Sequence, residues 1–413
     1  MNNKYCTSTY MKKVIGVAVA ASLLAGMAFA DVAVSLNARL RSNMYHQKKI
    51  NSDTTKTWMF DLDASKNDVK GGTGANAYDH THGGSGAMSD TLKFSAKNDY
   101  AGVTLETTGQ PNKENITGNT CYNGFIKFDA LTFTFGTFDS RNVSIYDVSA
   151  GESGLLKEDI TKYGVVNGDD YNLTKDANNF STVGGTKVVS LVADYTVDMG
   201  DGSLLLKGGL LSNKYDDDAE GSADNKKYQN AGYAFEGDFE NDAVKLQALF
   251  KLPAKKQTVF GVFADVKALP LPVAVGFSYG SDGNDGDAKH TEMAFDARVG
   301  YDISDAAKIT SAIKYESVKP DGGDNETALS IAAEVSYIVS DMTTVFADVG
   351  YYNYDLDGSD DDGNSRISIR PGVVLTAGKG AQITAALQYD KYTAADDQLQ
   401  SDMSIPVIFR VKF

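Results

Sequence analysis

The sequence predicts an all-β fold, a transmembrane antiparallel β-barrel of 16–18 strands with long outer loops and short periplasmic turns. Three observations support this prediction. Apolar and polar residues alternate with period two in segment after segment, which is typical of strands with one apolar and one wet face. Short and long connections alternate along the chain. Past residue 30 no apolar run approaches the roughly 18–20 residues that a membrane helix needs, which excludes a helical membrane protein.

The first 30 residues have the features of a cleaved export signal. Lys12 and Lys13 precede the short apolar run 14–27, and Ala28-Phe29-Ala30 is a small-x-small cleavage site. A membrane anchor would need a longer apolar core with a charged stop after it. We therefore expect residues 1–30 to be removed during bacterial export beyond the inner membrane.

Cleavage would leave residues 31–413 as the mature barrel. Cys6 would leave with the signal and Cys121 would stay alone, so no intrachain disulfide could form. Either Met1 or Met11 could be the start of the chain.

The first strand follows the signal directly. Apolar side chains occupy one face of this strand, at Val32, Val34, Leu36, Ala38 and Leu40. The same alternation recurs in sixteen later segments, at 92–97, 103–106, 126–128, 131–135, 189–195, 233–236, 244–250, 260–266, 273–279, 292–299, 308–314, 329–336, 345–349, 366–375, 382–388 and 405–413. One further strand is expected after the turn at 198–202. These segments amount to eighteen strands. Trp58, Phe60 and Leu62 also alternate, and they form either a hairpin within a loop or a strand missed in the count. The predicted number of strands is therefore 16–18.

The connections favour a membrane barrel over a soluble sandwich or solenoid. Short ones lie near 99, 130, 200, 241, 270, 304, 341 and 379. The mostly longer ones, which carry much of the acid, lie at 44–88, 110–120, 139–184, 212–228, 281–290, 319–326, 355–364 and 392–402. The connection at 253–256 is the exception, because it is short although the alternation predicts a long one. Short periplasmic turns and long outer loops are typical of outer-membrane barrels, whereas soluble sheets usually have shorter strands and an apolar interior.

Two stretches resemble bacterial outer-membrane porins. The segment Ile405–Phe413 resembles the terminal assembly signal, with Val407, Phe409, Val411 and Phe413 at every second position, which the barrel assembly machinery recognises. The segment Leu131–Asp139 resembles the strand of general porins that runs through a glycine into the constriction loop. Pro406 and eighteen rather than sixteen strands depart from the general porin pattern. The resemblance implies a homotrimer and makes 139–184 the candidate constriction loop.

A barrel of 16 or more strands is too wide for side chains to fill, so water should occupy its interior. The wet face then lines a channel, and the candidates on its wall are Arg39, Arg41, Lys93, Lys127, Arg366 and Arg370. By the porin resemblance, the 139–184 loop would set its acids Asp147, Glu152, Glu158 and Asp159 against this basic wall. Such a loop could instead project outward as a solvated acidic surface.

Other functional classes find little support in the residues. A net charge of −16 argues against nucleic-acid binding. The four histidines lie in presumed loops or at a strand edge, so no catalytic set, and thus no enzyme, is expected. No cofactor or metal is expected either, because three weak motifs fit flexible or solvated loops better: Gly72-x-Gly74-x-x-Ala77, His80-x-His82 and the acidic run 355–362.

The sequence therefore predicts an outer-membrane porin that passes small hydrophilic solutes and ions by diffusion. The alternative is a surface barrel whose acidic loops act as an adhesin or structural antigen. A substrate-specific channel is a third reading. Its sugar-binding form is less favoured, because Trp58 is the only tryptophan available for an aromatic track.

Overall fold

The computed structural model describes residues 31–50, 53–58, 87–109, 121–137, 173–177, 179–183, 186–212, 232–254, 256–283, 289–354, 364–378, 380–393 and 399–412. Nearly all of them lie in strands. In chain order the elements are β1 (Asp31–Ile50), β2 (Asp53–Trp58), β3 (Ala87–Lys97), β4 (Ala101–Gly109), β5 (Cys121–Phe128), β6 (Leu131–Gly136), α4 (Leu173–Asp176), β7 (Thr182–Val183), β8 (Thr186–Lys187), β9 (Ser190–Asp198), β10 (Gly202–Leu211), β11 (Gly232–Asn241), β12 (Val244–Leu252), β13 (Gln257–Val266), β14 (Val273–Asp282), β15 (His290–Asp302), β16 (Ala307–Pro320), β17 (Glu326–Ser340), β18 (Thr343–Tyr354), β19 (Asn364–Thr376), β20 (Ala381–Ala386), β21 (Gln388–Thr393) and β22 (Leu399–Lys412).

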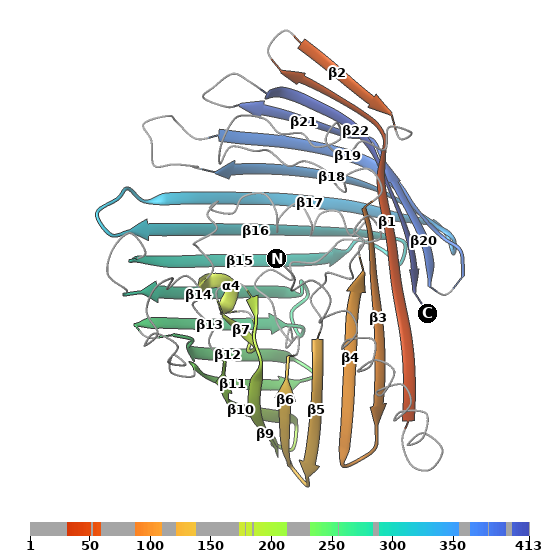
Figure 1. The fold of residues 1–413 in the computed structure, drawn as a ribbon. Helices are drawn as coiled ribbons and strands as arrows, with labels where there is room; N and C mark the ends of the chain where they lie inside the picture. The colour runs from red at the N-terminus through yellow and green to blue at the C-terminus, as the bar shows by residue number, and fades with distance from the viewer. Residues whose placement is uncertain are drawn as a thin grey trace, which may run out of the picture.

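The strands form a closed antiparallel ring (Figure 1). β6 pairs with β9, and β1 closes the ring between β3 and β22. β20 and β21 each pair with both β19 and β22, so they are two halves of one strand. In the part of the chain that the structure describes, β2 pairs with β1 alone. The twenty-stranded sheet is thus a ring of eighteen strands, which confirms the predicted barrel at the upper end of its range.

The two faces of the ring differ in chemistry. Along β11, Tyr233 and Phe235 are 47% and 54% exposed, whereas Ala234 and Glu236 between them are 0% and 4% exposed. The same contrast recurs in strand after strand, with large apolar side chains on the outer face and many buried polar or charged ones on the inner face. A soluble sheet protein buries its apolar face, so this distribution is inverted relative to a soluble fold.

Two prolines explain two irregularities at the end of the chain. Pro371 on β19 lacks an N–H, and the ladder between β19 and its neighbour is interrupted beside it, between β20 and β21. The Leu387 N–H at this break donates to the Pro371 carbonyl at 2.9 Å. Pro406 on β22 pairs with Asn43, and the register of β1 shifts directly afterwards. Pro406 is therefore accommodated in the closing strand next to a bulge.

The hairpin of β1 and β2 lies within the segment predicted as the loop 44–88. β1 continues to Ile50 and turns into β2, whose Trp58 pairs with Tyr45. The alternation at Trp58 therefore belongs to β2, which extends from the end of β1 and lies outside the ring (Figure 1). Phe60 and Leu62 lie outside the described residues.

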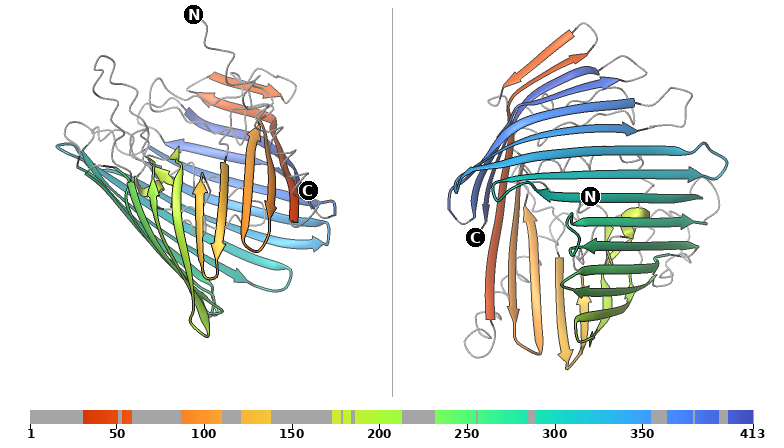
Figure 2. Two further views of the ribbon diagram at one scale, coloured as in Figure 1. Left: turned by 60° about the horizontal axis from the view of Figure 1, so that its bottom comes forward. Right: turned by 180° about the vertical axis from the view of Figure 1, so that it is seen from behind.

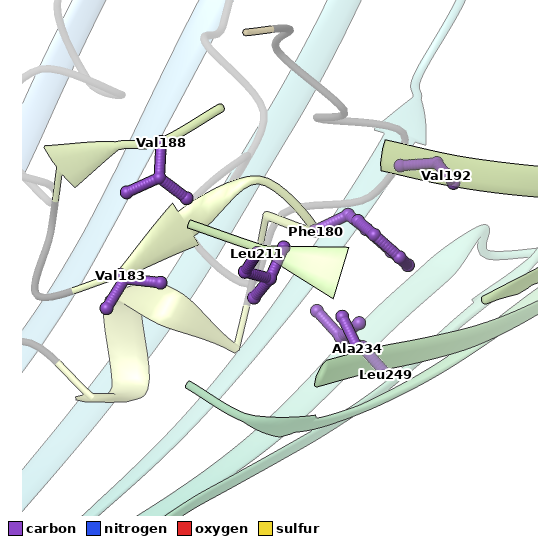
Figure 3. Close-up of a cluster of buried hydrophobic side chains, with 7 residues drawn as sticks. All are labelled: Phe180, Val183, Val188, Val192, Leu211, Ala234 and Leu249. Carbon is purple, nitrogen blue, oxygen red and sulfur yellow. The ribbon is translucent and has the colours of Figure 1, made fainter. Parts of the chain in front are cut away.

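One short piece of chain packs inside the ring. We call residues 173–177 and 179–183 the inward segment; it contains α4 and β7. α4 contacts the inner face of β13, β14 and β15, and the views in Figure 2 place it within the curve of these strands. Phe180, 0% exposed, packs in an apolar cluster with Val183, Val188, Val192, Leu211, Ala234 and Leu249 (Figure 3). The burial of this cluster stabilises the contact between the segment and the inner face of β9–β12.

Within the described residues, no helix is long and apolar enough to cross a membrane.

Candidate solute pathway

A band of paired charges runs along the inner face of the ring, and its first part lies on β10 and β11. Lys207 Nζ pairs with Glu236 and lies 2.9 Å from Asp238 Oδ2. The antiparallel register places Lys207 directly opposite Glu236 on one side and opposite Asp194 of β9 on the other. One cation therefore lies among three carboxylates, so this part of the inner face carries excess negative charge.

Two arginines of β19 make the most extensive part of the band. Arg370 donates from Nε and Nη2 to Asp348 Oδ2, at 2.9 and 2.6 Å. Arg366 donates from the same two atoms to Asp390 Oδ1, at 2.9 and 2.7 Å. The Gln388 amide donates to the second oxygen of Asp390 at 2.7 Å. Both arginines are at most 1% exposed, and hydrogen bonds of this charge-assisted kind are the condition for burying an ion pair.

Other inner-face cations remain in contact with solvent. Lys93 on β3 and Lys127 on β5 are exposed, and Arg298 on β15 is 29% exposed with Asp265 Oδ2 at 3.7 Å. Exposed charges of this kind act on ions over about 8–10 Å at physiological salt. The part of the inner face on β3 and β5 therefore presents accessible positive charge.

The inner face also holds the inward segment. Glu292 of β15 accepts hydrogen bonds from the N–H groups of Leu173 and Thr174, at 3.0 and 2.9 Å. Lys251 of β12, 0% exposed, donates to the carbonyls of Asp176 and Asn179, both at 2.9 Å, and to that of Thr182. The segment is thus held by a carboxylate at one end and by an ammonium group further along.

The structure places the predicted wall residues in different settings. Arg366 and Arg370 lie on the inner face but are buried in ion pairs, and Lys93 and Lys127 are exposed. For Arg39 and Arg41 the backbone is described: the register sets Arg39 opposite Arg410 and Arg41 opposite Ile408. In the predicted assembly signal, Val407, Phe409 and Val411 pair with β1, and Phe409 is 44% exposed on the outer face.

Several predicted features lie outside the described residues. They are the loop acids Asp147, Glu152, Glu158 and Asp159, the terminal Phe413, residues 1–30, the glycine and histidine motifs at 72–82 and the acidic run 355–362. Of the candidate constriction loop 139–184, the structure describes the inward segment, which lies against the inner face. In the described part of the chain, no three His, Cys, Asp or Glu side chains cluster as a metal site would require.

Sequence reasoning missed four charged inner-face residues of the strands, Lys251, Asp282, Asp390 and Asp402. The alternation that identified Lys245 and Gln247 as wet positions continues to Lys251, so parity alone could have found it. Its partners could not have been found in this way, because they are backbone carbonyls 69–75 residues earlier in the chain.

Comparisons with known proteins place this fold. No family model matches the chain, and no curated protein matches it. Among solved structures, OccK2 (OpdF) of Pseudomonas aeruginosa is 9% identical with a TM-score of 0.50, over 93% of this chain and 98% of that one. The anion-selective porin of Comamonas acidovorans is 14% identical with a TM-score of 0.47, over 93% and 100%. The trimer form of OmpT, an outer membrane protein of Vibrio cholerae, is 13% identical with a TM-score of 0.45, over 93% and 100%.

These likenesses concern the fold. The chain has a porin-like β-barrel fold, which combines a closed antiparallel ring, an apolar outer face and a charged inner face.

Proposed function

We propose that this protein is an outer-membrane porin that passes small hydrophilic solutes and ions by passive diffusion. The observation that carries the proposal is the inverted distribution of side chains around a closed ring. The outer face exposes large apolar side chains on all sides, among them Phe235 at 54%, Val349 at 52% and Ile369 at 49%. In water so much exposed apolar surface would drive association, whereas in a bilayer it contacts lipid.

The inner face suits solutes that carry polar groups. Its buried charges are largely compensated by partners, as in the Arg370–Asp348 pair, while Lys93 and Lys127 stay exposed on β3 and β5. We infer that the inward segment narrows the pathway and that exposed cations on β3 and β5 line a part of the wall outside β9–β15, where the segment packs. Passage would then depend on size first and on charge second.

Assembly and partners follow from the same proposal. The chain would enter the outer membrane through the barrel assembly machinery, with its last strand closing against β1, and would contact outer-membrane lipid. A homotrimer is part of the proposal on the strength of the porin resemblance. We propose neither a cofactor nor a catalytic reaction.

A liposome-swelling assay tests the proposal. Vesicles that contain the folded protein should swell in iso-osmotic solutions of small sugars, with a rate that falls steeply as the sugar grows. Vesicles that received the heat-denatured protein are the matched control and should not swell. Equal, negligible swelling in both would contradict the porin and favour the surface barrel that acts through its loops as an adhesin or structural antigen.

A further inference from the structure

Lys251 and Glu292 contact the inward segment in a way that the barrel itself does not require. We propose that these two residues are positioning residues: they fix the inward segment against the inner face and thereby set the width of the solute pathway. The inference rests on the proposed porin function and assigns a role in it to two residues of the wall.

Glu292 holds the beginning of the segment. Its two carboxylate oxygens accept the N–H groups of Leu173 and Thr174, and Oε2 also accepts the Thr174 hydroxyl at 3.1 Å. The N–H groups in the first turn of a helix have no partner within the helix, so α4 needs such an acceptor. His290 Nε2 lies 3.0 Å from Glu292 Oε1 on the same strand. A neighbour on the wall thus orients this carboxylate toward the segment.

Lys251 holds the rest of the segment. An ammonium group has three donors, and the three hydrogen bonds of Lys251 Nζ go to the carbonyls of Asp176, Asn179 and Thr182. These carbonyls are spread over seven residues and converge on one atom only in this backbone conformation. Lys251 is 0% exposed, so water cannot take over these hydrogen bonds while the segment is in place.

The inner face is also shaped to receive the segment. A Cβ atom added to Gly261 of β13 would lie 2.7 Å from the Ala177 carbonyl oxygen, and one added to Gly280 of β14 would overlap Leu173. Both glycines lie on the inward parity of their strands. Side chains at these two positions would push the segment toward the centre of the ring, so the glycines let it approach the wall closely.

The ring does not depend on these contacts for its closure. Main-chain pairing of β12 with β11 and β13 extends as far as Lys251 on both sides, and pairing of β15 with β14 and β16 continues past Glu292. Removal of either side-chain function should therefore leave a folded barrel in which the segment is held less firmly.

Single-channel recording tests the proposal with two variants, Lys251→Met and Glu292→Gln. Both should show noisier open levels and a conductance higher by roughly a factor of two, because conductance follows the open cross-section of a pore. Lys245→Met is the matched control, since Lys245 lies on the same face of the same strand, is 25% exposed and pairs with Glu240 rather than with the segment. The Lys245→Met channel should keep the steady open conductance of the wild-type protein. Native heat-modifiable mobility in gels shows whether each variant is folded. If only one of the two variants folds, that variant alone is sufficient for the comparison with the wild-type channel.

A reversible cross-link provides the rescue. The added Cβ of Gly261 would lie 3.2 Å from Ala177 Cβ, close to the ~3.5–4.5 Å of a disulfide. In a Cys121→Ser background, Ala177→Cys with Gly261→Cys should therefore cross-link on oxidation. Combined with Lys251→Met, the cross-link should remove the excess noise of the open level, and a reductant should bring that noise back. Because the new Cβ at position 261 displaces the segment toward the centre of the ring, the cross-linked channel should conduct at or below the wild-type level.

The outcomes separate this inference from the proposed function. Folded Lys251→Met and Glu292→Gln channels with wild-type conductance and noise would overturn the role of the two residues while the porin stands. A cross-linked Lys251→Met channel whose open level stays noisy would overturn it as well. A wild-type protein that never conducts would instead contradict the porin itself.

Discussion

At the scale of residues, the inner face is dominated by buried charges that are paired with one another. Arg370 with Asp348 and Arg366 with Asp390 are hydrogen-bonded ion pairs in which every charged group is at most 3% exposed. Such a pair contributes little net stability compared with apolar side chains of similar size, but loss of one partner leaves an uncompensated buried charge. The barrel should therefore tolerate removal of both partners better than removal of one.

Asp348→Leu tests this asymmetry. We expect the single change to lower the free energy of unfolding by roughly 3–5 kcal/mol, because Arg370 keeps its charge but loses the carboxylate that accepts its Nε and Nη2 hydrogen bonds. The double change Asp348→Leu with Arg370→Met should recover most of that loss. Lys267→Met, which removes an exposed pair with Glu240, is the control and should cost about 0–1 kcal/mol. Denaturant titration in detergent micelles measures all three. A double variant no more stable than the single one would contradict the account.

The arginines on β1 lead to a prediction about selectivity. Replacing Arg39 and Arg41 with Glu should shift the reversal potential in a salt gradient toward cations, because we expect both side chains to line the pathway. The control is Lys49→Glu with Lys56→Glu, which changes the charge equally at the far end of β1 and on β2, where these two strands form a hairpin. Lys49 lies eight residues along β1 from Arg41, which is roughly 26 Å at the usual rise per residue. Because salt screens charges over about 8–10 Å, the control should shift the potential less. Equal shifts in both double variants would place Arg39 and Arg41 away from the pathway.

At the scale of elements, the alternation of each strand decides which side chains lie on the outer face of the ring, where the proposed porin would contact lipid. On β4 the neighbouring positions Thr104 and Leu105 have opposite parity, and Leu105 pairs with the outward-facing Tyr122 of β5, which is 48% exposed. The register therefore assigns Leu105 to the lipid face and Thr104 to the inner face, with no other evidence needed.

Arginine at these two positions tests the assignment. Leu105→Arg should lower the free energy of unfolding in lipid vesicles by roughly 2–4 kcal/mol, the cost of a charge near the bilayer midplane, whereas Thr104→Arg should be nearly neutral. Urea titration of the protein refolded into vesicles gives both values. A larger loss for Thr104→Arg than for Leu105→Arg would mean that the faces are reversed.

Much of the element structure could be predicted because it depends on local pattern. Period-two alternation located seventeen of the eighteen strands, and the small and acidic residues at 198–202 marked a turn, present in the structure, after which the remaining strand was expected. The hairpin at Trp58 stayed ambiguous, since alternation does not tell whether a strand pairs within the ring or only with β1. The contacts of Lys251 and Glu292 were beyond prediction, because they join a segment to strands about 70 to 120 residues later through backbone atoms that carry no sequence signal.

At the scale of the whole molecule, the account makes one central claim. A ring of eighteen strands with lipid outside and polar groups inside should contain a water-filled path across the membrane. The inward segment occupies only part of that interior, against β9–β15. The barrel should then conduct ions even without any bound partner.

Planar-bilayer recording of the purified wild-type protein tests this claim most directly. The account predicts uniform stepwise increases in current as single barrels insert, each level scaling with the salt concentration. Silence across many insertions, with the protein shown by heat-modifiable mobility to be folded in the same membranes, would contradict it.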